Sequence, residues 1–168
     1  ALAIARVRSR WRLNGFPRGC RRGDIPCTKW RPAHGHPAAG VARGRAIAEE
    51  LGFNGALDGV RAAFDLASEE NRVAAVGYCW GGSVAYVANA RLGIPAVSYY
   101  GGRTVPLLRE RPKAPLMLHF GEHDALIPPE DVLKHREALP EAEIHVWPGV
   151  GHGFNCDQRD GYSASAAQ

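Results

Sequence analysis

Residues 72–83 read Arg-Val-Ala-Ala-Val-Gly-Tyr-Cys-Trp-Gly-Gly-Ser, and this stretch decides the predicted fold. Its apolar run predicts a buried strand, and the glycines after it predict a tight turn into a helix of small residues. A chain that reverses within a few bonds needs small residues two positions either side of the turn residue, which Gly77 and Gly81 provide. Cys79 is therefore a candidate nucleophile, because a helix N-terminus favours thiolate over thiol.

Two later segments show a similar pattern, an apolar run followed by a polar loop. The first covers residues 114–128 and the second covers residues 144–154. Each places one ionisable residue just past a predicted strand end, Asp124 and His152, where open α/β sheets collect catalytic groups. The chain order of nucleophile, acid and histidine is that of the α/β-hydrolase fold.

Cys79, His152 and Asp124 would each have a separate role in acyl transfer. His152 would accept the thiol proton and return it to the leaving group, and Asp124 would hold the imidazole tautomer. The backbone N–H of Trp80 would donate to the oxyanion. Taken singly, Cys79 is also typical of a buried structural cysteine, and Asp124 and His152 are typical of surface loops. Their joint order favours a catalytic triad.

The other histidines after residue 36 have no such context, and the sequence predicts structural roles for them. His119 and His145 fall inside predicted strands, His123 lies beside the predicted acid, and His135 falls on a charged helix face.

Three stretches together, residues 77–82, 120–128 and 148–154, resemble the dienelactone hydrolase (carboxymethylenebutenolidase) family. The resemblance implies hydrolysis of an ester or enol-lactone through a thioester acyl-enzyme, with no metal and no organic cofactor. Residues 96–102 also resemble the family's strand ending in Tyr-Tyr-Gly, which implies that Tyr100 lines the substrate pocket. The alternative for Tyr100 is an aromatic side chain that caps the sheet edge.

One departure from the family bears on the substrate. Members that act on dienelactone carry a hydroxyl residue directly after the histidine and an arginine shortly beyond it, which grip the substrate carboxylate. Here Gly153 follows His152, and Phe154, Asn155 and Cys156 come next. A carboxylate clamp is not evident, so the expected substrate is a small ester or lactone that need not be dienelactone.

The resemblance covers residues 37–168, which we expect to form a partial α/β-hydrolase domain, incomplete at both ends. A complete family member has several earlier strands, which supply the second oxyanion amide, and a closing helix. Without those strands one side of the sheet would be unpaired and apolar, which predicts a liability to aggregation or self-association. We expect a monomer or weak self-association. The alternative to a working hydrolase is an inactive fragment or scaffold that lacks the full oxyanion hole.

The positive charge of the chain is concentrated in its first part. The first 45 residues hold 11 Lys and Arg against one acid, a net charge of +10, and the remaining residues hold 10 against 16, a net charge of −6. Residues 1–36 show neither helical nor strand periodicity and predict an irregular Arg-rich segment. Three origins remain open: a basic nucleic-acid or anionic-surface arm, a targeting peptide, and, favoured here, a stretch foreign to the fold from a frame error or truncated gene.

Cysteine usage and hydropathy bear on location and cofactors. The spacing of Cys20, Cys27, His34 and His36 fits no common zinc site. A chain whose best cysteine must stay a free thiolate favours a reducing compartment, so we expect a cytoplasmic location. No apolar run approaches the roughly 20 residues that span a bilayer. The expected partner is a small molecule, with neither membrane nor nucleic acid.

Periodicity predicts alternating helices and strands from residue 38 onward. We expect helices over 41–50, ended by Gly52, and over 56–66, 83–90 and 128–139, with strands near 73–76, 96–100, 115–120 and 143–147. This alternation favours right-handed crossovers and a mainly parallel sheet with flanking helices, the α/β class.

Overall fold

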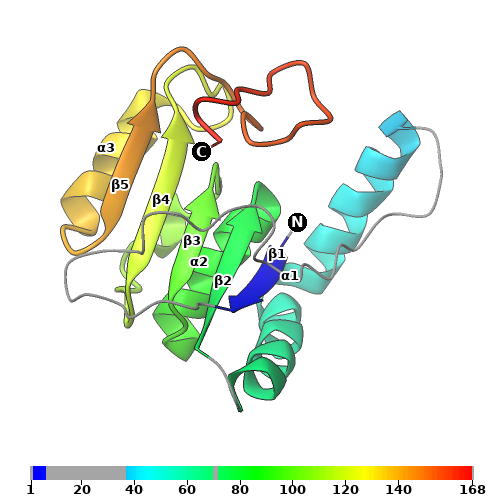
Figure 1. Cartoon of the computed structure of the whole chain (residues 1–168), viewed down its shortest axis with the longest axis vertical. Coiled ribbons are helices and arrows are strands. Elements are labelled where there is room, and N and C mark those ends of the chain that lie inside the picture. The colour runs from blue at the N-terminus through cyan, green and yellow to red at the C-terminus, as the bar shows by residue number, and fades with distance from the viewer. Residues whose placement is uncertain (1, 7–36, 70–71, 168) are drawn as a thin grey trace.

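The computed structural model describes residues 2–6, 37–69 and 72–167, which form a five-stranded sheet with helices against it (Figure 1). The strands are β1 (Leu2–Arg6), β2 (Val73–Tyr78), β3 (Ala96–Tyr99), β4 (Leu116–Gly121) and β5 (Glu143–Trp147). The helices are α1 (Pro37–Ser68), α2 (Trp80–Leu92) and α3 (Pro129–Ala138), with a short 3-10 helix, η1 (Val105–Leu107). Strands β2 to β5 are parallel and lie in chain order. The predicted α/β class and all four predicted strands are confirmed.

Strand β1 was not expected from the sequence. It pairs antiparallel with β2, Leu2 opposite Gly77 and Arg6 opposite Val73. The prediction of an irregular segment is therefore wrong for residues 2–6, and the side of β2 that was expected to be unpaired has a partner. Five residues carry too little periodicity to predict a strand, whereas the free edge of β2 supplies the hydrogen bonds. The rest of the Arg-rich segment, residues 7–36, lies outside the described residues.

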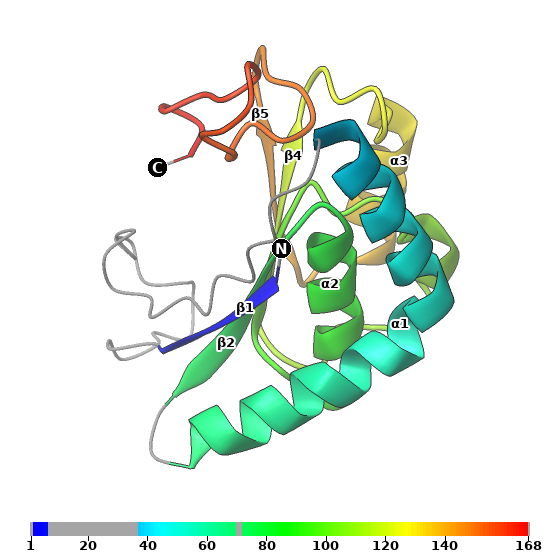
Figure 2. The same cartoon turned by 90° about the vertical axis from the view of Figure 1, so that its right-hand side faces the viewer.

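The three helices lie on one face of the sheet (Figure 2). Alternate residues of β4, Leu116, Leu118 and Phe120, are buried in the apolar core with the small side chains of α2. Ten consecutive residues of α2 are buried, because its glycines and alanines let it approach the strands closely. This helix therefore forms the centre of the helical layer.

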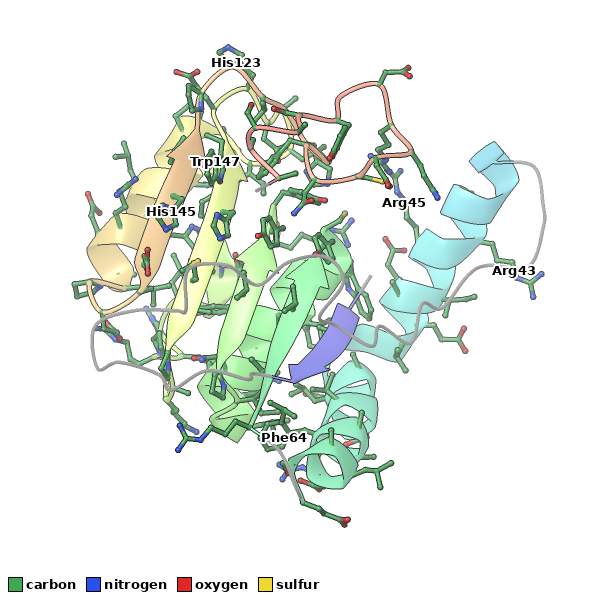
Figure 3. All side chains as sticks on the ribbon, viewed as in Figure 1. Arg43, Arg45, Phe64, His123, His145 and Trp147 are labelled. Atoms are coloured by element: carbon green, nitrogen blue, oxygen red, sulfur yellow. The ribbon has the colours of Figure 1, made fainter. Side chains whose placement is uncertain are left out.

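The opposite face carries a row of stacked rings. Tyr78, Tyr99, His119 and His145 stand at matching register on β2 to β5, with ring centroids 5.1, 4.5 and 5.0 Å apart and planes within 13°. The separation matches the spacing of neighbouring strands. Trp147 lies on the same face as His145 (Figure 3), and its indole Nε1–H donates to His119 Nδ1 at 3.1 Å.

Helix boundaries follow local signals. Gly52 has φ 59° and ψ −176° and interrupts α1, as the sequence predicted for the end of its first half. Helix α2 begins at Trp80, three residues before the predicted start, because the carbonyl of Cys79 already accepts the backbone N–H of Gly82 at 2.8 Å. Helix α3 begins at Pro129, within a residue of the expected start.

The predicted position of His135 on a charged face is wrong. Its side chain is 2% exposed, and its ring packs against Phe120 of β4. The Nδ1–H of His135 donates to the carbonyl of Asp131 at 2.6 Å, and Nε2 accepts from the hydroxyl of Thr104 at 2.7 Å. Charged neighbours on both sides hide this in the sequence, but the helical period turns His135 toward the sheet.

Candidate active site

Cys79 occupies the turn between β2 and α2. Its backbone has φ 56° and ψ −123°, and its N–H donates to the carbonyl of Tyr99 at 3.0 Å. A Cβ on Gly77 would collide with the carbonyl of Gly81, and one on Gly82 would lie 2.8 Å from the carbonyl oxygen of Tyr99. The glycines are therefore required for the turn to close and to pack on the end of β3.

The structure brings together the three residues that the sequence singled out. His152 Nε2 lies 3.2 Å from the Sγ of Cys79, and His152 Nδ1 lies 2.8 Å from the Oδ2 of Asp124. The Asp124 side chain is fully buried and that of His152 is 16% exposed. The other carboxylate oxygen of Asp124 accepts the N–H of Leu126 at 2.9 Å, which fixes the carboxylate against its own loop.

Hydrogen bonding shifts the protonation of this pair toward the charged forms. The hydrogen bond from His152 lowers the pKa of the Cys79 thiol, which burial opposes. Burial also opposes charge on His152, but the bonds to Asp124 and Cys79 outweigh it and raise the pKa of the imidazole to about 9. Each charged form therefore stabilises the other, and the arrangement favours a thiolate beside an imidazolium.

Trp80 is the first residue of α2, and its backbone N–H points at the sulfur of Cys79. A hydrogen bond from this N–H to the sulfur contributes to the lowered pKa of Cys79. The amide at this helix N-terminus is thus a donor to negative charge at the turn.

Tyr100 lies beside the imidazole. Its ring is 5.1 Å from that of His152 and 5.2 Å from that of Phe154, edge to face in both cases, and only 3% of the residue is exposed. Burial raises the pKa of its hydroxyl far above the ordinary value, and Cys156, Tyr78 and Cys79 add to this. The hydroxyl therefore stays protonated and can donate a hydrogen bond.

Arg159 is a residue that the sequence analysis missed. A Cβ on Gly153 would lie 3.3 Å from its Cδ and 3.4 Å from its Nη1, so the guanidinium packs against the residue that follows His152. Two successive turns fold the chain back. The N–H of Cys156 donates to the carbonyl of Gly153, and the N–H of Arg159 donates to the carbonyl of Cys156. The glycine at 153, whose φ in the structure is 86°, and the polar run after it are the sequence signals of such a return.

His123 lies apart from the group formed by Cys79, Asp124 and His152. His123 is on the loop tip before Asp124 and points away from the sheet (Figure 3), 3.8 Å from a carboxylate oxygen of Glu122. Within residues 2–6, 37–69 and 72–167, no group of three or more His, Cys, Asp or Glu could hold a metal ion. The cysteines and histidines of the rejected zinc spacing, Cys20, Cys27, His34 and His36, lie outside the described residues. No helix in the described part is long and apolar enough to cross a membrane.

Comparison with known proteins agrees with the fold. "Putative carboxymethylenebutenolidase" of Yersinia pestis is 35% identical over 116 residues, which cover 60% of this chain and 43% of that protein. "Carboxymethylenebutenolidase" of Pseudomonas putida is 33% identical over 102 residues, which cover 57% of this chain and 43% of that protein. The chain thus matches less than half the length of these relatives.

A solved structure gives the same relationship. The "Putative Dienelactone Hydrolase" of Klebsiella pneumoniae is 31% identical, with a TM-score of 0.50 over 55% of this chain and 45% of that one. The family model described as "Dienelactone hydrolase family" matches residues 43–168, most of this sequence. The chain belongs to the dienelactone hydrolase family.

Proposed function

We propose that this protein hydrolyses an ester or lactone with Cys79 as nucleophile, His152 as acid and base, and Asp124 as the group that orients His152. The observation that carries the proposal is the continuous path from the Cys79 sulfur through both nitrogens of His152 to the Asp124 carboxylate, at 3.2 and 2.8 Å. This path supplies the nucleophile, the proton carrier and the orienting carboxylate of acyl transfer.

In the proposed acylation, the thiolate of Cys79 attacks the carbonyl carbon and forms a C–S bond. The carbonyl electron pair moves to oxygen, where the N–H of Trp80 donates to the oxyanion. When the intermediate collapses, the bond to the leaving oxygen breaks, and the imidazolium of His152 gives its proton to that oxygen. An ester gives a free alcohol and a thioester on Cys79, and a lactone gives a thioester on Cys79 whose acyl chain carries the new hydroxyl.

In the proposed deacylation, neutral His152 takes a proton from a water molecule as the water oxygen attacks the thioester carbon. The C–S bond then breaks and releases the carboxylic acid and the thiolate of Cys79. Asp124 supports the imidazolium in both steps, because its carboxylate accepts the Nδ1–H. The resting ion pair is thus restored.

The surroundings of the thiol suggest which substrates bind. We propose that the Tyr100 hydroxyl donates to the substrate and that the Arg159 guanidinium attracts a carboxylate or other anionic group, since both lie beside His152 and Gly153. A resting thiolate is easily oxidised, so a reducing, cytoplasmic location fits this proposal. The substrate we propose is a small molecule. We further propose that the protein acts as a monomer or with weak self-association.

The test is burst kinetics with p-nitrophenyl acetate. We expect one rapid equivalent of nitrophenol per active site, from acylation of Cys79, and loss of the burst in Cys79→Ala. Cys156→Ala is the matched control, because Cys156 is also a free thiol and should leave the burst in place. Equal background rates for the unchanged protein and Cys79→Ala would contradict the hydrolase and favour an inactive scaffold.

A further inference from the structure

His152 is held by its side chain more than by its backbone. It lies between Gly151 and Gly153, and Gly153 has φ 86°, so the loop itself restricts the residue little. Hydrogen bonds at the two ring nitrogens define one axis through the imidazole, from Asp124 to Cys79. They do not stop the ring from tilting about that axis, so a third contact is needed to fix its plane.

The ring of Tyr100 supplies a contact of this kind. It meets the imidazole at a centroid distance of 5.1 Å and an angle of 61°, and it meets Phe154 at 5.2 Å and 74°. Phe154 is fully buried and so forms a rigid support. Tilting the imidazole would drive it into this packed pair of rings.

Tyr100 is itself held in a conformation that a bulky residue rarely adopts. Its φ is 41°, and its N–H donates to the carbonyl of His119 at 2.7 Å. Residues in such regions persist only when their surroundings impose them. The contacts of the loop that follows Tyr100 must therefore contribute to its position.

Two helices fasten that loop. The hydroxyl of Thr104 donates to Nε2 of His135 in α3 at 2.7 Å, and both side chains are 2% exposed. The hydroxyl of Ser83 in α2 donates to the carbonyl of Gly102 at 2.5 Å. The loop that follows Tyr100 is thus tied to α3 at Thr104 and to α2 at Gly102.

We propose that Tyr100 is a positioning residue whose ring fixes the plane of the His152 imidazole, and that the Thr104–His135 hydrogen bond holds Tyr100 in place. The inference rests on the proposed function, because the plane of His152 matters through its bond to the Cys79 sulfur. It is separate from the hydrogen bond that the Tyr100 hydroxyl is proposed to make with substrate.

The first test follows the pH dependence of iodoacetamide labelling at Cys79, mapped by mass spectrometry. Tyr100→Leu removes the ring, so we expect the apparent pKa of the thiol to rise by about one unit and labelling at pH 6 to slow about tenfold. Tyr100→Phe keeps the ring and should keep the labelling profile, while ester turnover shows a raised KM from loss of the hydroxyl. His145→Leu is the matched control, since the His145 ring lies in the same row but stacks on His119 and Trp147.

The second test acts at a distance from the site. Thr104→Val removes the hydroxyl that bonds His135, and we expect a shift in the Cys79 profile in the same direction as that of Tyr100→Leu. Thr104→Ser keeps a hydroxyl and should restore the unchanged profile. Thermal melts show that each variant compared is folded.

Three outcomes would overturn the inference. They are an unchanged Cys79 profile in folded Tyr100→Leu, an equal shift in His145→Leu, and an unchanged profile in Thr104→Val. The labelling assay needs no ester turnover, so failure of the proposed function is seen separately. A protein without turnover whose thiol still responds to Tyr100→Leu and not to Tyr100→Phe would contradict the hydrolase and support the positioning role.

Discussion

At the scale of single residues, Gly153 and Arg159 determine what lies beside the imidazole. Gly153 leaves room for the guanidinium, because a Cβ there would lie 3.3 to 3.4 Å from two atoms of Arg159 and would also have to adopt φ 86°. The guanidinium acts on Tyr100 as a positive charge that opposes the raised pKa of its hydroxyl. A guanidinium cation thus lies against Gly153, the residue that follows His152.

Replacing Arg159 should therefore change selectivity. For Arg159→Gln we expect KM for an ester with a free carboxylate to rise roughly 10-fold to 100-fold, the worth of a charge-assisted hydrogen bond, with little change for a neutral ester of similar size. Steady-state kinetics on the two esters measures this. Arg103→Gln is the control, since the Arg103 side chain is 70% exposed and pairs with Glu49. Equal losses on both esters would show that Arg159 does not recognise the anion.

At the scale of elements, Asn89 ties α2 to the beginnings of two strands. Its side chain is fully buried, and its Nδ2 donates to the carbonyls of Ile94 and Ala114 at 3.0 Å and of Pro115 at 3.2 Å. These carbonyls lie just before β3 and β4. One amide group therefore joins the central helix to the strands that end near the site.

We expect Asn89→Leu to lower the free energy of unfolding by about 3 kcal/mol, because buried carbonyls lose their donor. Urea unfolding followed by circular dichroism measures this difference. Asn54→Leu provides the comparison, since Asn54 is exposed and its Oδ1 accepts a hydrogen bond from Arg91 at 2.8 Å. This substitution should lower the free energy of unfolding by less than about 1 kcal/mol. A loss no larger than that of Asn54→Leu would contradict the role of Asn89.

At the scale of the whole molecule, the row of stacked rings joins all four parallel strands on the face opposite the helices. His119 is central in this row, between Tyr99 and His145. Burial, with a smaller effect from His145, lowers the pKa of His119 to about 3. The folded protein therefore holds this histidine neutral, while the unfolded chain protonates it near pH 6.5.

This difference makes stability depend on pH. Between the two pKa values the unfolded state binds a proton that the folded state does not bind. The contribution of His119 to the free energy of unfolding is therefore present above pH 6.5 and is lost as pH falls toward 3. Lowering the pH from 7 to 5 should reduce the free energy of unfolding by about 2 kcal/mol through His119. Urea unfolding at both pH values checks this, and His119→Gln, which cannot titrate, should show a smaller difference. An equal pH difference in both proteins would contradict it.

The sequence by itself determined the α/β class, the four parallel strands and the order of Cys79, Asp124 and His152. These depend on signals within a few residues of each other, such as apolar runs, glycines around a turn and ionisable residues just past strand ends. The parallel arrangement of strands then carries the three side chains to one edge of the sheet. Their proposed catalytic roles stay predictions.

Only the tertiary structure decided the pairing of β1 with β2, the burial of His135 and the place of Arg159 beside Gly153. Each depends on a partner far away in the chain or on a loop that folds back. Residues 2–6 carry too few side chains to show a period, and His135 has charged neighbours that mask its inward position. Local sequence patterns cannot specify such contacts, because their free energy comes from surfaces that meet only after the chain has folded.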